Sequence, residues 1–298
     1  MTEDAHRTGA VRDVPPPRPV DPSATAAPVE ETGLGRAARA VADAVGGLIG
    51  SPAEGSATDG VRSAAAGLRN VLGAVAGAVG GAFTPGRAEA TDPPSAAGDR
   101  TPGALFGDLL AAAAPRLPIR DADRLRQAFP GASDDEIAEA LVARAGRLTS
   151  AVGAATGGLS ATHWFLPASL LALPLELGAE TVLIGAVEVV LVGELHELHG
   201  QPAAGDARTR AAAYLQSWSE QRAVDGADVA AFGSLLGVVG LGAVRRAVTR
   251  KLFRSVPAAA PFLLGAAIAG RSNRRATETL AGRVLADLRA RRSADRDS

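Results

Sequence analysis

The stretch LELGAETVLIGAVEVVLVGELHELHG, residues 175–200, decides the fold of this chain. Its apolar runs at 181–184 and 187–192 are rich in Val, Ile and Thr, which favour strands. The stretch is too long for one strand, however, and Glu176 and Glu180 stand four residues apart, as on one face of a helix. Gly200 supplies a helix stop. We therefore predict one long helix over residues 175–199.

Composition extends the helical prediction to the rest of the chain. Of 298 residues, 47% are hydrophobic and only 3% aromatic, so the apolar content is mostly Ala, Val and Leu. Ala and Leu are strong helix formers, and we expect an all-α, Ala/Gly-rich helical bundle. The 31 basic and 32 acidic residues give a net charge of -1, which provides no general attraction for nucleic acid. The absence of cysteine excludes disulfides and thiolate catalysis.

Changes in composition divide the sequence into five parts. Residues 1–33 form a Pro-rich tail that we expect to be disordered, because it has too little apolar surface to offset the entropy of ordering. Residues 34–84 predict two short Gly/Ala-rich helices, at about 34–49 and 60–83. Residues 85–103 are a linker with several prolines. The folded core is expected to begin near Ala104 and to occupy residues 104–292, followed by a disordered C-terminus at 293–298.

Capping residues mark two helices within that core. Ser133 and Glu136 have the spacing of a capping box, after a shorter helix at 121–129 that Pro130 and Gly131 close. Asp206 is placed to cap a second helix. Its expected buried face has the i, i+3, i+4, i+7 spacing and consists of Ala211, Tyr214, Leu215 and Trp218.

Several uncharged stretches raise the question of a membrane. Residues 148–174 contain no Asp, Glu, Lys or Arg and are long enough to cross a bilayer, but their prolines and small polar residues make a stable span unfavourable. The other uncharged runs, at 70–86, 229–244 and 255–270, are at or just below the minimum spanning length. We interpret them as buried helices, a re-entrant hairpin, or segments docked at a membrane surface.

A basic amphipathic helix is predicted at residues 241–254. Leu241, Val244, Val248 and Leu252 share one face, and the other face carries candidate lipid-surface residues, which are Arg246, Arg250, Lys251 and Arg254. An ordinary solvated face is the competing interpretation. The series Gly73, Gly77 and Gly81 has the spacing of close-packing membrane helices and suggests homo-oligomer contacts through Gly-rich helices.

Ligands for a metal are concentrated only at the end of the long helix. His196 and His199 are three residues apart with Glu194 nearby, so both imidazoles can face one metal, but no third ligand is indicated and the zincin pattern is not met. A polar helix end is the alternative interpretation. No cofactor is predicted, because no Walker motif precedes Lys251 and no nucleophile elbow occurs.

Three more glutamates lie in the apolar part of this helix. For Glu176, Glu180 and Glu188 we expect pairing with buried arginines, for example Arg144 or Arg147. A di-iron site is not expected, since the Glu-x-x-His partner helices are missing. The string GLGRAA at 33–38 matches a dinucleotide fingerprint, but a proline-rich segment precedes it where a strand is required, and we reject it.

Three segments of the core resemble bacterial helical proteins related to the EcsC family. They are EVVLVGELHELHG at 188–200, YLQSW at 214–218 and GAAIAGRSNRRAT at 265–277. The resemblance covers about residues 104–292. It implies membrane association and an accessory role, with no catalytic residues.

These observations support three hypotheses. The first is a non-enzymatic accessory or scaffold protein that associates with a membrane surface or membrane protein complex. Because the N-terminus has no secretory signal, the expected place is the inner face of the cell membrane, as a peripheral or hairpin protein. The alternative is a soluble helical enzyme that binds a metal or ligand through Glu194, His196 and His199. In the third, the apolar segments are the core of a soluble scaffold.

Overall fold

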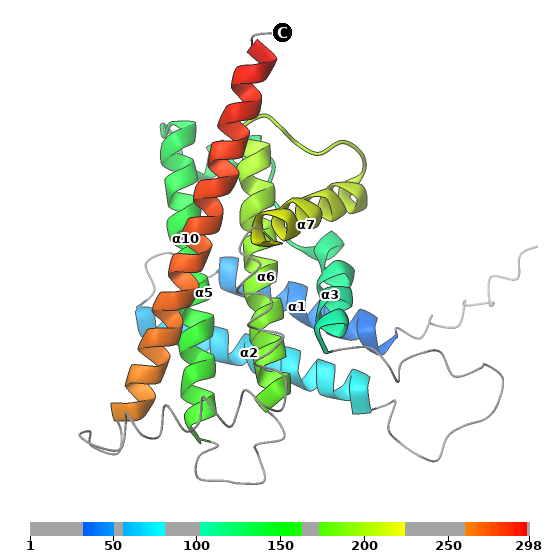
Figure 1. The fold of residues 1–298 in the computed structure, drawn as a ribbon, viewed down its shortest axis with the longest axis vertical. Helices are drawn as coiled ribbons and strands as arrows, with labels where there is room; N and C mark the ends of the chain where they lie inside the picture. Colours follow the sequence, from blue (N-terminus) through cyan, green and yellow to red (C-terminus); the bar gives the residue numbers. More distant parts are fainter. Residues whose placement is uncertain (1–31, 51–55, 81–101, 163–172, 224–259, 297–298) are drawn as a thin grey trace, which may run out of the picture. The chain divides into compact units, whose positions relative to one another are not determined.

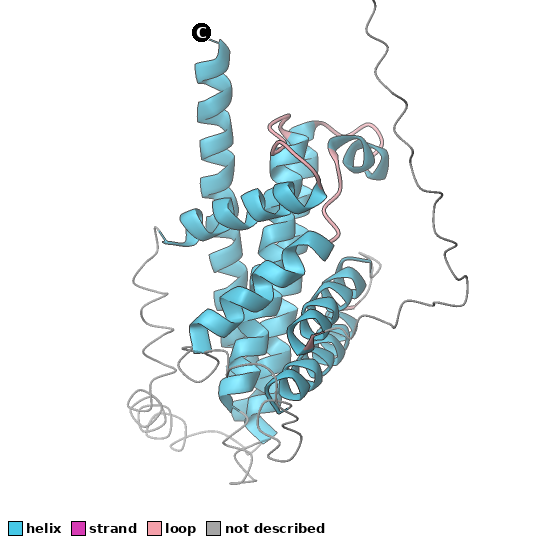
Figure 2. Cartoon of the chain, turned by 90° about the vertical axis from the view of Figure 1, so that its right-hand side faces the viewer, coloured by secondary structure: helices cyan, strands magenta, loops and turns pink. Residues whose placement is uncertain are grey.

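Every described element of the chain is helical. The computed structural model describes residues 32–50, 56–80, 102–162, 173–223 and 260–296, and these residues form eight α-helices, one 3-10 helix and no strand (Figure 2). The predicted all-α class is confirmed. The helices are α1 (Gly33–Gly50), α2 (Ala57–Gly80), α3 (Pro102–Ala113), η1 (Ala114–Arg116), α4 (Ala122–Ala128), α5 (Asp134–Thr162), α6 (Leu173–Leu198), α7 (Ala207–Ala223) and α10 (Ala260–Arg296).

The predicted helix starts are confirmed in detail. At the start of α5 the backbone N–H of Glu136 donates to Ser133 Oγ at 3.3 Å, and the backbone N–H of Ser133 donates to the Glu136 carboxylate at 2.8 Å. This reciprocal pair is the capping box that the sequence predicts. Asp206 caps α7 by accepting from the backbone N–H of Thr209 at 2.8 Å. Local sequence therefore fixes where these helices begin.

The predicted long helix is α6, and it ends as expected. Gly200 has a φ of 71°, a left-handed conformation that favours glycine, and the next backbone N–H, of Gln201, donates to the His196 carbonyl at 2.9 Å. The apolar runs that favour strands by propensity lie within α6, where Val182, Leu183 and every residue from 187 to 192 are buried against neighbouring helices. Tertiary burial thus overrides strand propensity here.

Three long helices, α5, α6 and α10, pack together (Figure 1). Contacts between α5 and α10 show that these two run antiparallel: Thr149 meets Thr277 near the middle, and Asp135 at the start of α5 meets Arg289 near the end of α10. At the crossing, a Cβ on Gly153 would lie 3.2 Å from the backbone carbonyl of Ala269, so only glycine allows this close approach.

The shorter helices complete the same core. α1 packs on α2, and both contact the long helices, so Val41, Val45 and Leu68 belong to one hydrophobic cluster with residues of α5, α6 and α10. The folded core therefore begins at α1 rather than near Ala104. The Gly/Ala-rich segment has the helices that the sequence predicts, but their buried faces need the later helices as partners.

Three glycines of α6 make room for larger side chains of its neighbours. Added Cβ atoms would meet the ring of Phe106 at Gly178, the indole of Trp218 at 3.3 Å at Gly185, and Ile119 at 2.9 Å at Gly193. The ring of Tyr214 also lies 3.0 Å from the Cβ position of Gly193. The spacing of seven and eight residues puts these glycines along one side of α6, facing α3, α7 and the segment after η1.

Within the described ranges, no helix has the length and apolar character needed to cross a bilayer. The uncharged stretch at 148–174 is split between α5 and α6, and its middle lies outside the described residues. Other predicted features also lie outside the described residues: the uncharged run at 229–244, the basic helix at 241–254, Gly81, and most of the tail and linker. Gly73 and Gly77 are exposed on α2 with open space around them, so the oligomer contact predicted there stays a prediction.

Candidate functional site: the buried polar residues of α6

Several buried ionisable side chains lie along α6. Every residue from 185 to 199 is buried, including Glu188, Glu194 and Glu197. Burying a carboxylate costs free energy unless it is paired with a cation and hydrogen-bonded. The partners of these three carboxylates therefore indicate whether they have a structural or a catalytic role.

Two arginines hold Glu194. Arg120, in the segment after η1, donates from Nε to Oε1 at 2.7 Å, and Arg144 of α5 donates from Nη2 to Oε2 at 2.6 Å. The carboxylate is fully buried and both guanidinium groups are mostly buried. Burial lowers the pKa of Arg144, and the negative charge of Glu194 opposes that change. Both carboxylate oxygens are therefore committed to cations of the protein itself.

Glu188 joins four helices. Its Oε2 accepts from Trp218 Nε1 at 2.9 Å and from Arg222 Nε at 3.1 Å, both on α7, while Arg222 Nη2 also binds Oε1. Oε1 accepts from the Thr277 hydroxyl of α10 at 2.8 Å, and that hydroxyl lies 3.0 Å from the hydroxyl of Thr149 on α5. This arrangement is a bidentate arginine pair with two further neutral donors, which satisfies the buried charge.

Glu197 connects the end of α6 to α7. It accepts from the Tyr214 hydroxyl at 2.8 Å and from Arg210 at 3.2 Å, and the Tyr214 oxygen in turn accepts from the backbone N–H of Ala203 at 3.2 Å. Burial raises the pKa of Tyr214 to about 12, so its hydroxyl remains a donor. These bonds fix the connection between the two helices.

The metal candidates His196 and His199 also have partners within the protein. Nδ1 of His196 lies 2.8 Å from the Val192 carbonyl, and the His199 carbonyl accepts from Arg292 at 2.6 Å. Burial lowers the pKa of both imidazoles. In the part of the chain that the structure describes, no three His, Asp or Glu side chains are placed to hold a metal, and Glu194 is bound by two arginines. The metal hypothesis gains no third ligand and stays a prediction.

Glu180, which is half-buried, differs from Glu188, Glu194 and Glu197. It accepts from Asn273 Nδ2 at 3.0 Å and from the Thr156 hydroxyl, which are neutral donors from α10 and α5. Burial, only partly opposed by these hydrogen bonds, raises its pKa to about 7. A carboxyl group with this pKa is partly protonated at neutral pH.

The predicted pairing with a mostly buried arginine is confirmed for Glu188, but the example partners are wrong, and Glu180 accepts hydrogen bonds from neutral donors. Glu188 does pair with an arginine, but with Arg222 rather than Arg144 or Arg147. Arg144 instead pairs with Glu194. The only sequence signal for the true partner is that Trp218 and Arg222 are four residues apart on α7, which puts two donors on one helical face.

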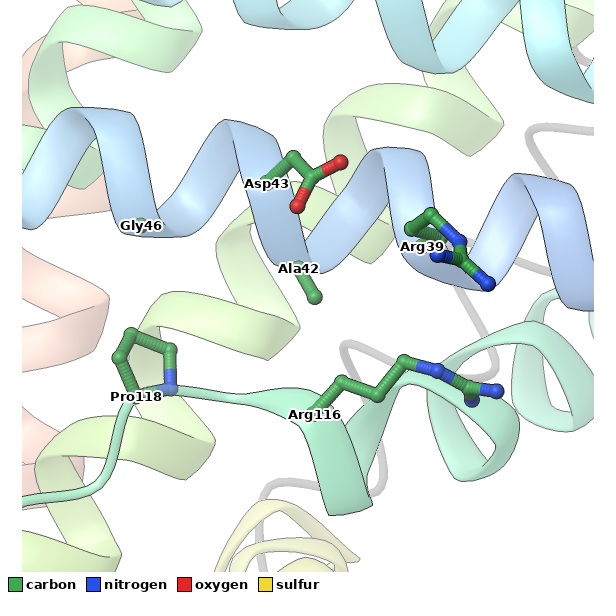
Figure 3. Close-up of a pocket in the computed structure, with 6 residues that line it drawn as sticks. All are labelled: Arg39, Ala42, Asp43, Gly46, Arg116 and Pro118. Atoms are coloured by element: carbon green, nitrogen blue, oxygen red, sulfur yellow. The ribbon is translucent and has the colours of Figure 1, made fainter.

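A surface groove lies between α1 and the segment that follows α3 (Figure 3). Arg39, Ala42, Asp43 and Gly46 line it from α1, and Arg116 and Pro118 line it from the other side. Figure 3 shows the side chains of Arg39 and Arg116 on opposite sides of the groove. Arg116, at the end of η1, donates to the Ala112 carbonyl of α3 at 2.8 Å. This mixed-charge groove contains no nucleophile next to a base.

The start of α10 carries a different kind of surface. Ile268 is 66% exposed, far more than the other described large apolar side chains, and the exposed residues Arg271, Arg274 and Arg275 follow it. Arg274 pairs with Glu278, whereas Arg271 and Arg275 make no ion pair with any described residue. The candidate lipid-surface residues lie just before this helix, outside the described ranges: Arg246, Arg250, Lys251 and Arg254.

Comparisons with models of known protein families, with curated proteins and with solved structures find no match to this chain.

Proposed function

We propose that this chain is a non-enzymatic, helical accessory or scaffold protein that associates with the inner face of the cell membrane. The buried carboxylates of α6 support a structural role for the polar cluster. Glu188, Glu194 and Glu197 are each bound by arginines of neighbouring elements, which leaves no open carboxylate-imidazole pair for catalysis among the described residues. The polar groups of α6 hold helices together.

The exposed start of α10 carries the membrane part of this proposal. The exposed Ile268 is followed within two helical turns by Arg271 and Arg275, which make no ion pair with any described residue. In helices that bind membrane surfaces, an apolar side chain inserts among the lipids while nearby cations stay at the headgroup layer. The uncharged run at 229–244 and the four basic residues at 246–254 precede it in sequence and add the same chemistry. Each basic side chain near an anionic surface contributes about 1 kcal/mol. The resemblance to EcsC-related proteins leads to the same expectation.

Vesicle sedimentation tests this proposal. The full-length protein should bind vesicles that contain anionic lipid, should bind neutral vesicles much less, and should dissociate as salt is raised. Replacing Arg246, Arg250, Lys251 and Arg254 together by Gln should weaken binding several-fold at low salt. The double variant Arg271→Gln and Arg275→Gln should also weaken it, and Ile268→Ser should weaken binding to neutral and anionic vesicles alike.

A matched control distinguishes the loss of a specific lipid-binding surface on α10 from the effect of removing positive charge anywhere on the protein. Arg62 and Arg69 are exposed arginines on α2, and changing both to Gln removes as much charge as the double variant on α10. This control should bind vesicles as the native protein does. If the native protein ignores anionic vesicles at low salt, or if the α2 control loses as much binding as the α10 variant, the proposal is wrong.

A further inference from the structure

A groove lies between α3 and α7. Both helices pack on α6, where Leu110 of α3 and Trp218 of α7 meet over Gly185. Next to this contact, α3 and α7 enclose a groove of about 450 Å³. That volume is within the usual range for small-molecule sites in proteins, about 300 to 1,000 Å³.

The lining of this groove is mostly apolar, and its polar side chains, Arg208, Gln216 and Ser219, all belong to α7. Leu110 and Ala111 line it from α3, and Leu215 and Trp218 line it from α7. The indole of Trp218 is held in place because its Nε1 donates to Glu188. Arg208, in the first turn of α7, is the only charged residue of the lining, and it makes no ion pair with any described residue. An apolar wall with one available cation at its end complements an apolar ligand with one negative charge.

The dimensions select the class of ligand. From Arg208 to Ser219 the α7 wall extends over about 16 Å at 1.5 Å per residue, the length of a medium-chain acyl group. A partner helix of the same length and about 10 Å diameter would occupy more than about 1,200 Å³, well beyond this groove. The groove therefore suits a single extended chain rather than a helix.

We propose that the groove between α3 and α7 binds a medium-chain fatty carboxylate, with its chain along Leu110, Leu215 and Trp218 and its carboxylate at Arg208. This binding is independent of the membrane contact proposed for α10, because it uses other helices. A guanidinium group binds a carboxylate with two parallel hydrogen bonds and a favourable charge interaction. Glutamine is neutral and provides neither the charge nor the paired donors.

Trp218 provides a direct readout of ligand binding. The chain has two tryptophans, so Trp164→Phe leaves Trp218 as the only emitter. Dodecanoate, kept below its micelle concentration, should change Trp218 emission with a saturable dependence in this background. Arg208→Gln should weaken dodecanoate binding several-fold and leave dodecanol binding unchanged, because only the carboxylate interaction is lost.

Filling the groove tests its location. Gly107 lines it, and a Cβ there would meet nothing within 4 Å, so Gly107→Leu should fold and should occupy the space of the acyl chain. We expect at least about tenfold weaker dodecanoate binding, measured by isothermal titration calorimetry. The matched control is Gly282→Leu, another exposed helical glycine with open space, which should bind as the parent does. Circular dichroism melts confirm that both variants fold.

Several outcomes would overturn the fatty-acid proposal and leave the membrane proposal standing. The first is that Trp218 emission shows no saturable change with monomeric dodecanoate. The second is that Gly107→Leu and Gly282→Leu bind dodecanoate equally well. The third is that Trp218 emission changes with anionic vesicles but not with dodecanoate. If Gly107→Leu fails to fold, Ala212→Phe on the opposite wall provides the same test. Conversely, dodecanoate binding without any vesicle binding would support the groove and contradict the membrane proposal.

Discussion

Replacing Glu180 by glutamine is expected to change how the stability of this protein depends on pH. The carboxyl group accepts hydrogen bonds from neutral donors, Asn273 and Thr156, and burial raises its pKa to about 7 from an ordinary value of 4.5. Because the folded chain holds this proton more tightly than the unfolded chain, folding is favoured where the group is protonated. The contribution is fully present below about pH 4.5 and declines as pH rises towards 7.

The size of this effect follows from the two pKa values. At 1.36 kcal/mol for each pH unit between them, the protonated form contributes up to about 3 kcal/mol relative to the ionised form. Glu180→Gln is neutral at every pH and keeps an oxygen for Asn273. The variant should match the native protein near about pH 4.5 and should be more stable by up to about 3 kcal/mol near about pH 8.

Urea unfolding followed by circular dichroism at a series of pH values measures this difference. The contrasting variant is Glu188→Gln, which leaves the mostly buried guanidinium of Arg222 without its carboxylate and should destabilise the protein by about 3 kcal/mol near about pH 8, where Glu180→Gln stabilises it. The reasoning about Glu180 is refuted if the difference between its variant and the native protein stays constant across the series.

Four further outcomes are expected. Trp218→Ala should destabilise the fold by about 3 kcal/mol in urea melts, since the ring packs on α6 and its N–H binds a buried carboxylate; a loss under about 1 kcal/mol would contradict this packing. Glu194→Gln should lower stability by about 3 kcal/mol because two mostly buried guanidinium groups lose their charge partner, and salt should rescue little of it. Deleting residues 1–31 should leave the melting temperature unchanged, because the described buried core begins in α1. Elemental analysis of purified protein should find no stoichiometric metal, and changing His196 and His199 to Ala should not alter that result; one equivalent of bound zinc would revive the metal hypothesis.

Local signals in the sequence predict the helix boundaries well. The capping box of Ser133 and Glu136 and the cap at Asp206 each depend on residues three positions apart. The helix stop at Gly200 is local as well, because glycine adopts the left-handed conformation that ends the helix. The helical state of α6 follows from its length. None of these features needs information from a distant part of the chain.

The partners of the buried charges depend on how the helices pack, which the sequence pattern does not reveal. Glu194 lies between Arg120 and Arg144, which are 74 and 50 residues away in sequence. Arginines are frequent throughout this chain, and nothing in the local sequence of α6 distinguishes Arg222 from Arg147 as the partner of Glu188. For the same reason, composition alone placed the start of the core too late, because α1 and α2 gain their buried contacts from helices much later in the chain.

The glycines along one side of α6 offer a way to find distant relatives of this protein. Gly178, Gly185 and Gly193 each accommodate a large side chain from another element, and the spacing between them is set by the helix itself. A large side chain at position 185 would therefore collide with Leu110 and Trp218, and we expect it to be accompanied by a smaller residue at one of these two positions. In an aligned set of homologues, these positions should vary as pairs rather than singly, and such paired variation would identify kinship where overall sequence identity is too low to do so.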